Sequence, residues 1–181
     1  FEGQSWYQIE FRLNPNKPKP NAVFLPRAVM NAHVYLNGYW IGGLGSLQGD
    51  ISRHWNHPYL FQFSPELLNV GNNTLLIQVA GYKNYRSGLG RVWVGPSQTL
   101  EPLYDSAYRW QVTGSMLATL VAFGSGLLLL LFAKVFREQE GFYFLALAVI
   151  VFAARNTGYF MDWVPLPHAL WGQLVHSLHA W

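Results

Sequence analysis

The pattern of apolar and polar residues divides the chain into two unlike parts. Up to residue 109, short alternating or apolar runs are separated by Gly, Pro and Asn, whereas residues 110–181 are almost uncharged and largely apolar. The first pattern is typical of short strands joined by turns, and the second of membrane-spanning helices. We therefore expect an all-β sandwich or jelly roll over residues 1–103, followed by transmembrane α-helices over residues 104–181.

Several short strands and one helical turn are predicted in the first part. In residues 5–13, SWYQIEFRL, apolar and polar side chains alternate, so one face of a strand would contact a core. Asn37-Gly38 is a pair that tight hairpin turns prefer, and it joins the runs 32–36 and 39–41. Ser64-Pro65-Glu66 predicts a helical turn with Ser64 as the N-cap. Further strands are expected at residues 22–25, 59–63, 74–79 and 91–94.

The longest uncharged run predicts a membrane span. From Trp110 to Ala133 it holds 24 residues. A helix of that length extends for about 36 Å, more than the roughly 30 Å of a bilayer's hydrocarbon core. We expect spans at about residues 110–133 and 141–160, and the start of a third at 168–181.

The loops on either side of the second span differ in charge. Lys134 and Arg137 lie in the connection before it, whereas residues 162–167 hold no basic side chain. The positive-inside rule then places the connection in the cytoplasm and the β domain outside the cytoplasmic membrane. Within the first span, Ala118, Ala122 and Gly126 recur every four residues, which predicts a face for close helix packing, although small residues are frequent in membrane helices generally.

Composition and motifs exclude several classes of function. The formal charge of +3 comes from scattered basic residues, so no basic face for nucleic acid is expected. The absence of cysteine excludes a disulfide scaffold and thiolate sites. We expect no metal site at His168, His176 and His179, because no Cys is available and no acidic residue follows Asp162. We expect no cofactor and no enzymatic activity in this part of the protein, because phosphate-loop, nucleophile-elbow and HExxH motifs are absent. The chain starts without Met and ends within an apolar stretch, so further residues are expected on both sides.

Aromatic and polar residues in or beside predicted loops are the candidates for a ligand site. Aromatic rings next to amide groups are suited to stack on a sugar or to hold a small polar ligand. The alternative is that they fill cores, since 17% of the chain is aromatic. The candidates are Trp40, Trp55, His57, Tyr82, Tyr85 and Arg86.

A second group of candidates concerns signal coupling between the two parts of the chain. Tyr104, Tyr108 and Trp110 lie where the first span begins, as interfacial aromatic residues do. Arg155 would place a charge within the second span. Its side chain could face a partner or a watery cavity, extend to the membrane interface, or pair with Asp162.

Two sequence resemblances add to this interpretation. VYLNGYWIGGLG followed by WNHPYLFQFSPELLNVGNNTLLIQV resembles galactose-binding-like jelly rolls of the β-galactosidase type. WYQIEFRL, GLGRVWVGP and an apolar region after YDSAYRWQ together resemble the bacterial seven-transmembrane receptors with diverse intracellular signalling modules. This resemblance implies a periplasmic sensor domain on the bacterial inner membrane. It also implies an effector beyond this sequence, such as a histidine kinase of a two-component system or a diguanylate cyclase.

The residues and the resemblances lead to a receptor hypothesis with two alternatives. In the first, the chain binds a carbohydrate, another small molecule or a partner, contacts membrane lipids, forms a homodimer and transmits through its helices. In the second, it is a membrane-tethered carbohydrate-binding or adhesion module without signalling. In the third, Arg155 and the histidines line a path in a transporter.

Overall fold

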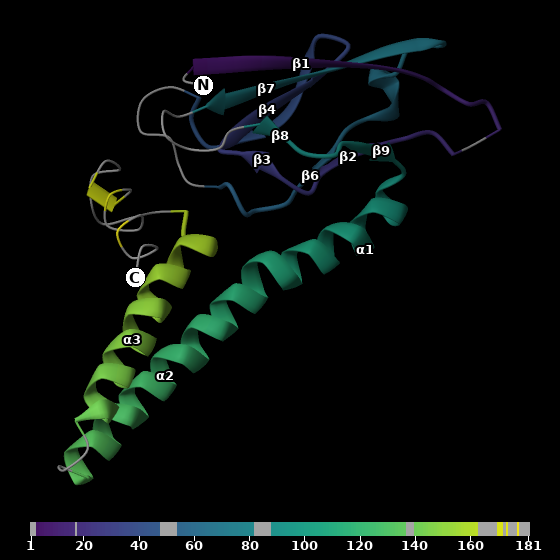
Figure 1. Ribbon diagram of the computed structural model, residues 1–181. Coiled ribbons are helices and arrows are strands. Elements are labelled where there is room, and N and C mark those ends of the chain that lie inside the picture. Colours follow the sequence, from purple (N-terminus) through teal and green to yellow (C-terminus); the bar gives the residue numbers. More distant parts are fainter. Residues whose placement is uncertain are drawn as a thin grey trace. The chain divides into compact units, whose positions relative to one another are not determined.

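The computed structural model describes residues 3–16, 18–47, 54–81, 88–136 and 140–162, together with 170, 171, 173 and 177. The chain divides into two compact units, Phe1–Gln111 and Val112–Trp181. The described strands all lie in the first unit, which also contains a helix, and the second unit contains two apolar helices (Figure 1).

The first unit is an antiparallel β-sandwich. One sheet has the strand order β1-β7-β4-β5, and the second has the order β6-β2-β9. A short pair, β3-β8, lies beside them. The strands are β1 (Gly3–Arg12), β2 (Ala22–Leu25), β3 (Ala28–Val29), β4 (Asn31–Leu36), β5 (Tyr39–Leu44), β6 (Tyr59–Gln62), β7 (Asn72–Gly81), β8 (Gly88–Leu89) and β9 (Trp93–Gly95).

The core lies between the two main sheets. Along most of β4 and β7, every second residue is buried and the intervening residues face outward. This period of two is the pattern of a half-buried sheet. Tyr59 closes the core, with 1% of its surface exposed. The fully buried aliphatic residues of this core include Val23, Leu25, Val34, Leu36, Leu75 and Ile77.

Strand β2 is buried on both faces because a helix covers its outer side. Val23 and Leu25 belong to the main core, whereas Ala22 and Phe24 pack against Leu100 of α1 (Ser97–Tyr108). A strand covered on both faces needs no polar positions, which explains why AVFL is continuously apolar.

The second unit is a helical hairpin of α2 (Gly114–Val135) and α3 (Gly141–Asn156), followed by the 3₁₀ turn η3 (Thr157–Tyr159). The two helices lie side by side (Figure 1). The buried positions recur every seven residues, at Thr119, Gly126 and Ala133 on α2 and at Ala146 and Ala153 on α3. Small residues allow the helix backbones to approach closely.

The predicted packing face of the first span is therefore only partly correct. Gly126 is buried as expected, and the Cβ that it lacks would lie 2.6 Å from Ile150 Cγ1. Ala118 is exposed and Ala122 is only half-buried. The buried positions follow the seven-residue interval at which two packed helices meet every second turn.

Two helices are long and apolar enough to cross a membrane. They comprise 39 residues at Ser97–Val135 and 19 residues at Gly141–Tyr159. The first continues from α1 through the π-helical segment η2 (Arg109–Thr113) into α2. The predicted third span, residues 168–181, lies largely outside the described residues.

The sequence predictions for the β domain are confirmed at most positions. The Asn37-Gly38 turn has both φ angles positive, 51° and 86°, as a primed hairpin turn requires. Ser64 caps the 3₁₀ turn η1 (Pro65–Leu67) by accepting a hydrogen bond from Glu66 N. Strands β3 and β8 were not predicted, because two residues are too short to produce a pattern. The segment between the last predicted strand and the first predicted span was not assigned a structure from the sequence, and it is helical from Ser97.

Candidate functional site

The outer face of the four-stranded sheet carries an aromatic surface, which we call the aromatic face and define by Trp6, Tyr35 and Trp40. Trp6 is 55% exposed and Trp40 is 62% exposed. Tyr35 of β4 lies opposite Trp40 of β5, so their side chains share one side of the sheet. The rings of Trp6 and Tyr35 lie 5.8 Å apart with their planes inclined at 38°. The three rings therefore form a shallow surface that water reaches.

Hydrogen-bonding side chains accompany these rings on the same side of the sheet. Trp6 lies opposite Gln78 of β7, and Gln78 Nε2 donates to Gln4 Oε1 over 2.7 Å. Along β1, Gln8 Nε2 donates to Glu10 Oε1 over 3.0 Å. Gln4 Nε2 also donates to Leu47 O over 3.2 Å. Exposed amides and carboxylates have more donors and acceptors than these bonds use, so some are left for a ligand.

His33 completes this side of the sheet and depends on a glycine. His33 lies opposite both Gln78 and Gly43, so its ring is on the side that carries the aromatic face. A Cβ at Gly43 would come 2.3 Å from His33 Cδ2, a distance at which the ring would have to move. The absence of a side chain at Gly43 therefore leaves room for the imidazole beside β5, where His33 Nε2 lies 3.4 Å from Gly45 O.

The structure describes two of the other predicted ligand residues, Trp55 and His57. Trp55 is half-buried and packs against Met30 and Ala80. The His57 ring lies 5.5 Å from that of His54, edge to face. A role for Trp55 and His57 in ligand binding stays a prediction. Tyr82, Tyr85 and Arg86 lie outside the described residues.

A second functional element is the attachment of α1 to the sandwich, which begins at Asn21. Asn21 Oδ1 accepts a hydrogen bond of 2.6 Å from Ser97 N, and Asn21 Nδ2 donates to Ser97 Oγ over 3.2 Å. Its backbone is also bonded, to Gly95 O and from Phe63 N. Because the residue before the helix, Pro96, offers no capping side chain, Asn21 supplies the cap from a distant part of the chain.

Apolar contacts continue this attachment along one side of α1. Leu100, Tyr104 and Ala107 are spaced four and three residues apart, so they share one face of the helix. That face packs on Ala22, Phe24 and Leu60, and the rings of Phe24 and Tyr104 meet edge to face at 6.4 Å. Gln62 Nε2 of β6 also donates to Glu101 Oε1 over 2.9 Å.

The far end of this helical segment is held by a second asparagine. Buried Asn56 donates from Nδ2 to Gln111 O over 2.7 Å. With the Gln111 amide assigned the orientation that satisfies its neighbours, its nitrogen donates to Asn56 O and Pro26 O over 2.9 and 3.2 Å. Gln111 belongs to the π-helical segment, and such irregular turns are frequent at functional sites.

The predicted coupling residues have different environments. Tyr104 packs on the sandwich and its ring lies 5.9 Å from that of Tyr108, with the planes inclined at 38°. Trp110 is 80% exposed. In α3, the Arg155 guanidinium carbon lies 5.8 Å from the ring centre of Phe152. Arg155 Nε is buried and has no hydrogen-bond partner in the described structure. Coupling through Tyr108, Trp110 and Arg155 stays a prediction.

Among the described residues, no three His, Cys, Asp or Glu side chains come together in a way that would hold a metal ion. The chain contains no cysteine, so thiolate ligands are absent throughout.

The fold and the site define the first unit as an antiparallel β-sandwich with an attached helix. No family model matches the chain, and neither does any curated protein. The sandwich is similar to parts of several solved glycosidases, which are carbohydrate-active enzymes.

One of these structures is a β-glycosidase from Bacteroides vulgatus, with 22% identity and a TM-score of 0.40 over 51% of this chain and 12% of that enzyme. Another is a β-D-glucuronidase from Dictyoglomus thermophilum, with 17% identity and a TM-score of 0.39 over 53% of this chain and 21% of that enzyme. A Bacteroides uniformis β-glucuronidase matches with 20% identity and a TM-score of 0.41, over 52% of this chain and 12% of that enzyme. The chain thus spans a small part of each enzyme, and these loose similarities assign it no activity.

Proposed function

We propose that this chain is the input part of a bacterial membrane receptor whose β-sandwich binds a carbohydrate outside the cytoplasmic membrane. Binding is transmitted through α1 and α2 to an effector outside this sequence, such as a histidine kinase. The receptor works in the inner membrane as a homodimer. The resemblance noted in the sequence supports the receptor class, and the residues of the first unit support the ligand class.

The aromatic face is the observation that carries the ligand class. Both faces of a pyranose ring present C–H groups, which pack on aromatic rings, while its hydroxyl groups need donors and acceptors around the stack. Trp6 and Trp40 leave more than half of their surface in water, and monomeric proteins expose such groups of rings mainly at interaction sites. Gln4, Gln8, Glu10, His33 and Gln78 supply the polar groups on the same side of the sheet.

The attachment of α1 supports transmission. The asparagine bonds at Ser97 and Gln111 hold both ends of the helical segment that belongs to the sandwich, and its backbone continues into the apolar α2. A ligand changes the conformation of a receptor only if it binds two arrangements of the protein with different affinities. A firmly held helix provides the element whose position such a ligand would change. We expect this change to alter the environment of four side chains: Tyr104, Tyr108, Trp110 and Arg155.

The ligand class is tested with the full chain in lipid nanodiscs on an array of soluble oligosaccharides. We expect saturable binding of at least one glycan class and a loss of about tenfold or more on Trp6→Ala or Trp40→Ala, because each ring contributes about 1–3 kcal/mol of contact. Trp93→Ala is the matched control, since Trp93 is 45% exposed on the other sheet. Equal losses in all three variants, or no glycan binding, would contradict the proposal.

Transmission is tested in the full-length protein with its effector. The sugar identified on the array should change effector activity, and Asn21→Ala should reduce this response more than it reduces sugar binding. If the sugar binds but effector activity is constant, the chain is a tethered carbohydrate-binding module and the receptor role is wrong.

A further inference from the structure

A hollow at one end of the β-sandwich lies on the other side of β1 from the aromatic face. It has a volume of about 490 Å³, within the range of about 300–1,000 Å³ that is usual for small-molecule sites. Phe11 lines the hollow and packs against the core, whereas Trp6 of the same strand faces outward; an odd separation along a strand places them on opposite sides. The hollow is therefore separate from the proposed sugar site.

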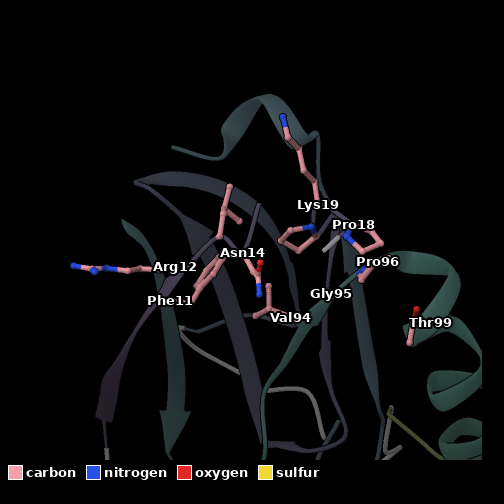
Figure 2. A pocket seen from close by; sticks show the side chains of 11 residues that line it. Phe11, Arg12, Asn14, Pro18, Lys19, Val94, Gly95, Pro96 and Thr99 are labelled. Atoms are coloured by element: carbon pink, nitrogen blue, oxygen red, sulfur yellow. The ribbon is translucent and has the colours of Figure 1, made fainter. Parts of the chain in front are cut away.

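Three segments of the chain build this hollow. Figure 2 shows Phe11, Asn14 and Val94 on one side of the hollow, Pro96 and Thr99 at the start of α1 on the other side, and the loop that carries Pro18 and Lys19 between these two groups. Phe11 and Val94 belong to the two main sheets and both pack on the core, so the floor of the hollow is firmly held. Pro18, Pro20 and Pro96 line its walls, and proline restricts the backbone there. The hollow is thus already formed and mostly apolar.

The charged side chains that line the hollow are both basic. Among the described residues no acidic side chain lines it, and the first turn of α1 contains no acidic residue. Arg12 lies at its edge, but its Nε donates to Asn72 Oδ1, and Figure 2 shows the side chain directed away from the other lining residues. Lys19 has no carboxylate partner within the described part of the chain. Figure 2 shows its exposed side chain directed outward from the mouth, and its flexible four-carbon stem allows the ammonium group to reach the rim.

From these features we propose that the hollow binds a small cyclic carboxylate. The apolar ring of the ligand packs on Phe11, Val94 and the prolines, and its carboxylate group meets the Lys19 ammonium. Asn14 and Thr99 provide further donors at the mouth. Because the site touches Gly95, Pro96 and Thr99, its occupant contacts the chain on both sides of Ser97, the residue that Asn21 holds. The inference concerns a second ligand and does not depend on sugar binding.

The test uses 4-fluorobenzoate and the full chain in nanodiscs, followed by ligand-observed fluorine NMR. We expect saturable binding with a Kd of about 1 mM or tighter, and binding at least about tenfold weaker for the neutral isostere 4-fluorobenzamide. Lys19→Gln should weaken the binding of 4-fluorobenzoate about tenfold and leave the affinity for 4-fluorobenzamide unchanged. Thr99→Trp, at an exposed position of the mouth, should block both compounds by filling the hollow.

Arg91→Gln is the matched control, because it removes the same charge from a described residue that does not line the hollow. Equal binding of the acid and the amide, an unchanged affinity in Lys19→Gln, or no saturable binding of 4-fluorobenzoate would each overturn the proposal. Glycan binding by these variants is measured in parallel and should be unaffected, so failure here is distinguishable from failure of the proposed function.

Discussion

Asn21 and Ser97 are 76 residues apart in the chain and joined by two hydrogen bonds, one to the backbone and one to the side chain of Ser97. Through its own backbone, Asn21 is also bonded to the end of β9 and to Phe63 just after β6. A single asparagine therefore connects the second sheet to the first residue of α1.

Replacing Asn21 by alanine should loosen α1 without unfolding the sandwich. The variant loses the cap of Ser97 N, which costs about 1–2 kcal/mol in the free energy of unfolding. We expect hydrogen exchange at the first-turn amides of α1 to accelerate by at least about tenfold, while the buried amides of β7 keep their protection. Mass spectrometry of peptides from the full chain in nanodiscs measures both.

Asn16→Ala is the control for that experiment, because Asn16 is an exposed asparagine in the loop before β2. It should leave exchange in α1 unchanged. A faster exchange across the whole sandwich in Asn21→Ala would mean that Asn21 stabilises the domain as a whole rather than the helix.

We expect the Tyr59 hydroxyl to make the protein less stable at alkaline pH. Burial raises the pKa of Tyr59 above the ordinary tyrosine value of about 10. The native state therefore holds this proton more tightly than the unfolded chain. The group leaves the free energy of unfolding unchanged below about pH 10 and lowers it as the pH rises further. Chemical denaturation from neutral to strongly alkaline pH should show this decline.

Tyr59→Phe separates the titration from the packing. The hydroxyl donates to Met30 O and His54 O at 3.3 and 3.4 Å, so its loss should cost about 1 kcal/mol at neutral pH. The variant should also lose stability less steeply above about pH 10. Tyr39→Phe, which changes a side chain that is 62% exposed, should behave like the unaltered protein. The same steep decline in all three proteins would refute the assignment.

Gly126 should tolerate no larger side chain where α2 meets α3. A Cβ at this position would lie 2.6 Å from Ile150 Cγ1. Gly126→Val should therefore destabilise the helical hairpin by about 1–3 kcal/mol. Loss of helical circular dichroism during titration of the nanodisc-extracted protein with a denaturing detergent measures this.

Gly124 provides a comparison within the same helix, since a Cβ there would meet no atom within 4 Å. Gly124→Val should therefore unfold at nearly the same detergent concentration as the unaltered protein. If both variants were equally sensitive, the effect would arise from β-branching in the helix and not from contact with α3.

Local patterns were sufficient to predict most strands of the sandwich. The alternation in residues 5–13, the Asn37-Gly38 turn and the Ser64 cap each act over a few residues, and the structure contains all three. Helix α1 was not predicted because its apolar residues are few and Pro102 lies within it. Its stability depends on Phe24 and Asn21, which are distant in the chain.

The candidate site shows the same difference between local and distant information. Trp40 was a candidate because it follows a turn, but Trp6 and Tyr35 were read as ordinary strand residues. Their alternation with core residues placed them on the outer face, and that signal was present in the sequence. Only the strand order β1-β7-β4-β5 places the rings of Trp6 and Tyr35 5.8 Å apart.

The sequence by itself determined that short strands precede long apolar helices, because alternation, turn residues and uncharged length are local properties of the chain. Tertiary structure alone decided which strands are neighbours, that an asparagine at position 21 caps a helix at 97, and that Gly126 rather than Ala118 lies in the helix contact. These features depend on contacts between residues far apart in the chain. Such contacts form only when the chain folds, so local sequence patterns do not reveal them.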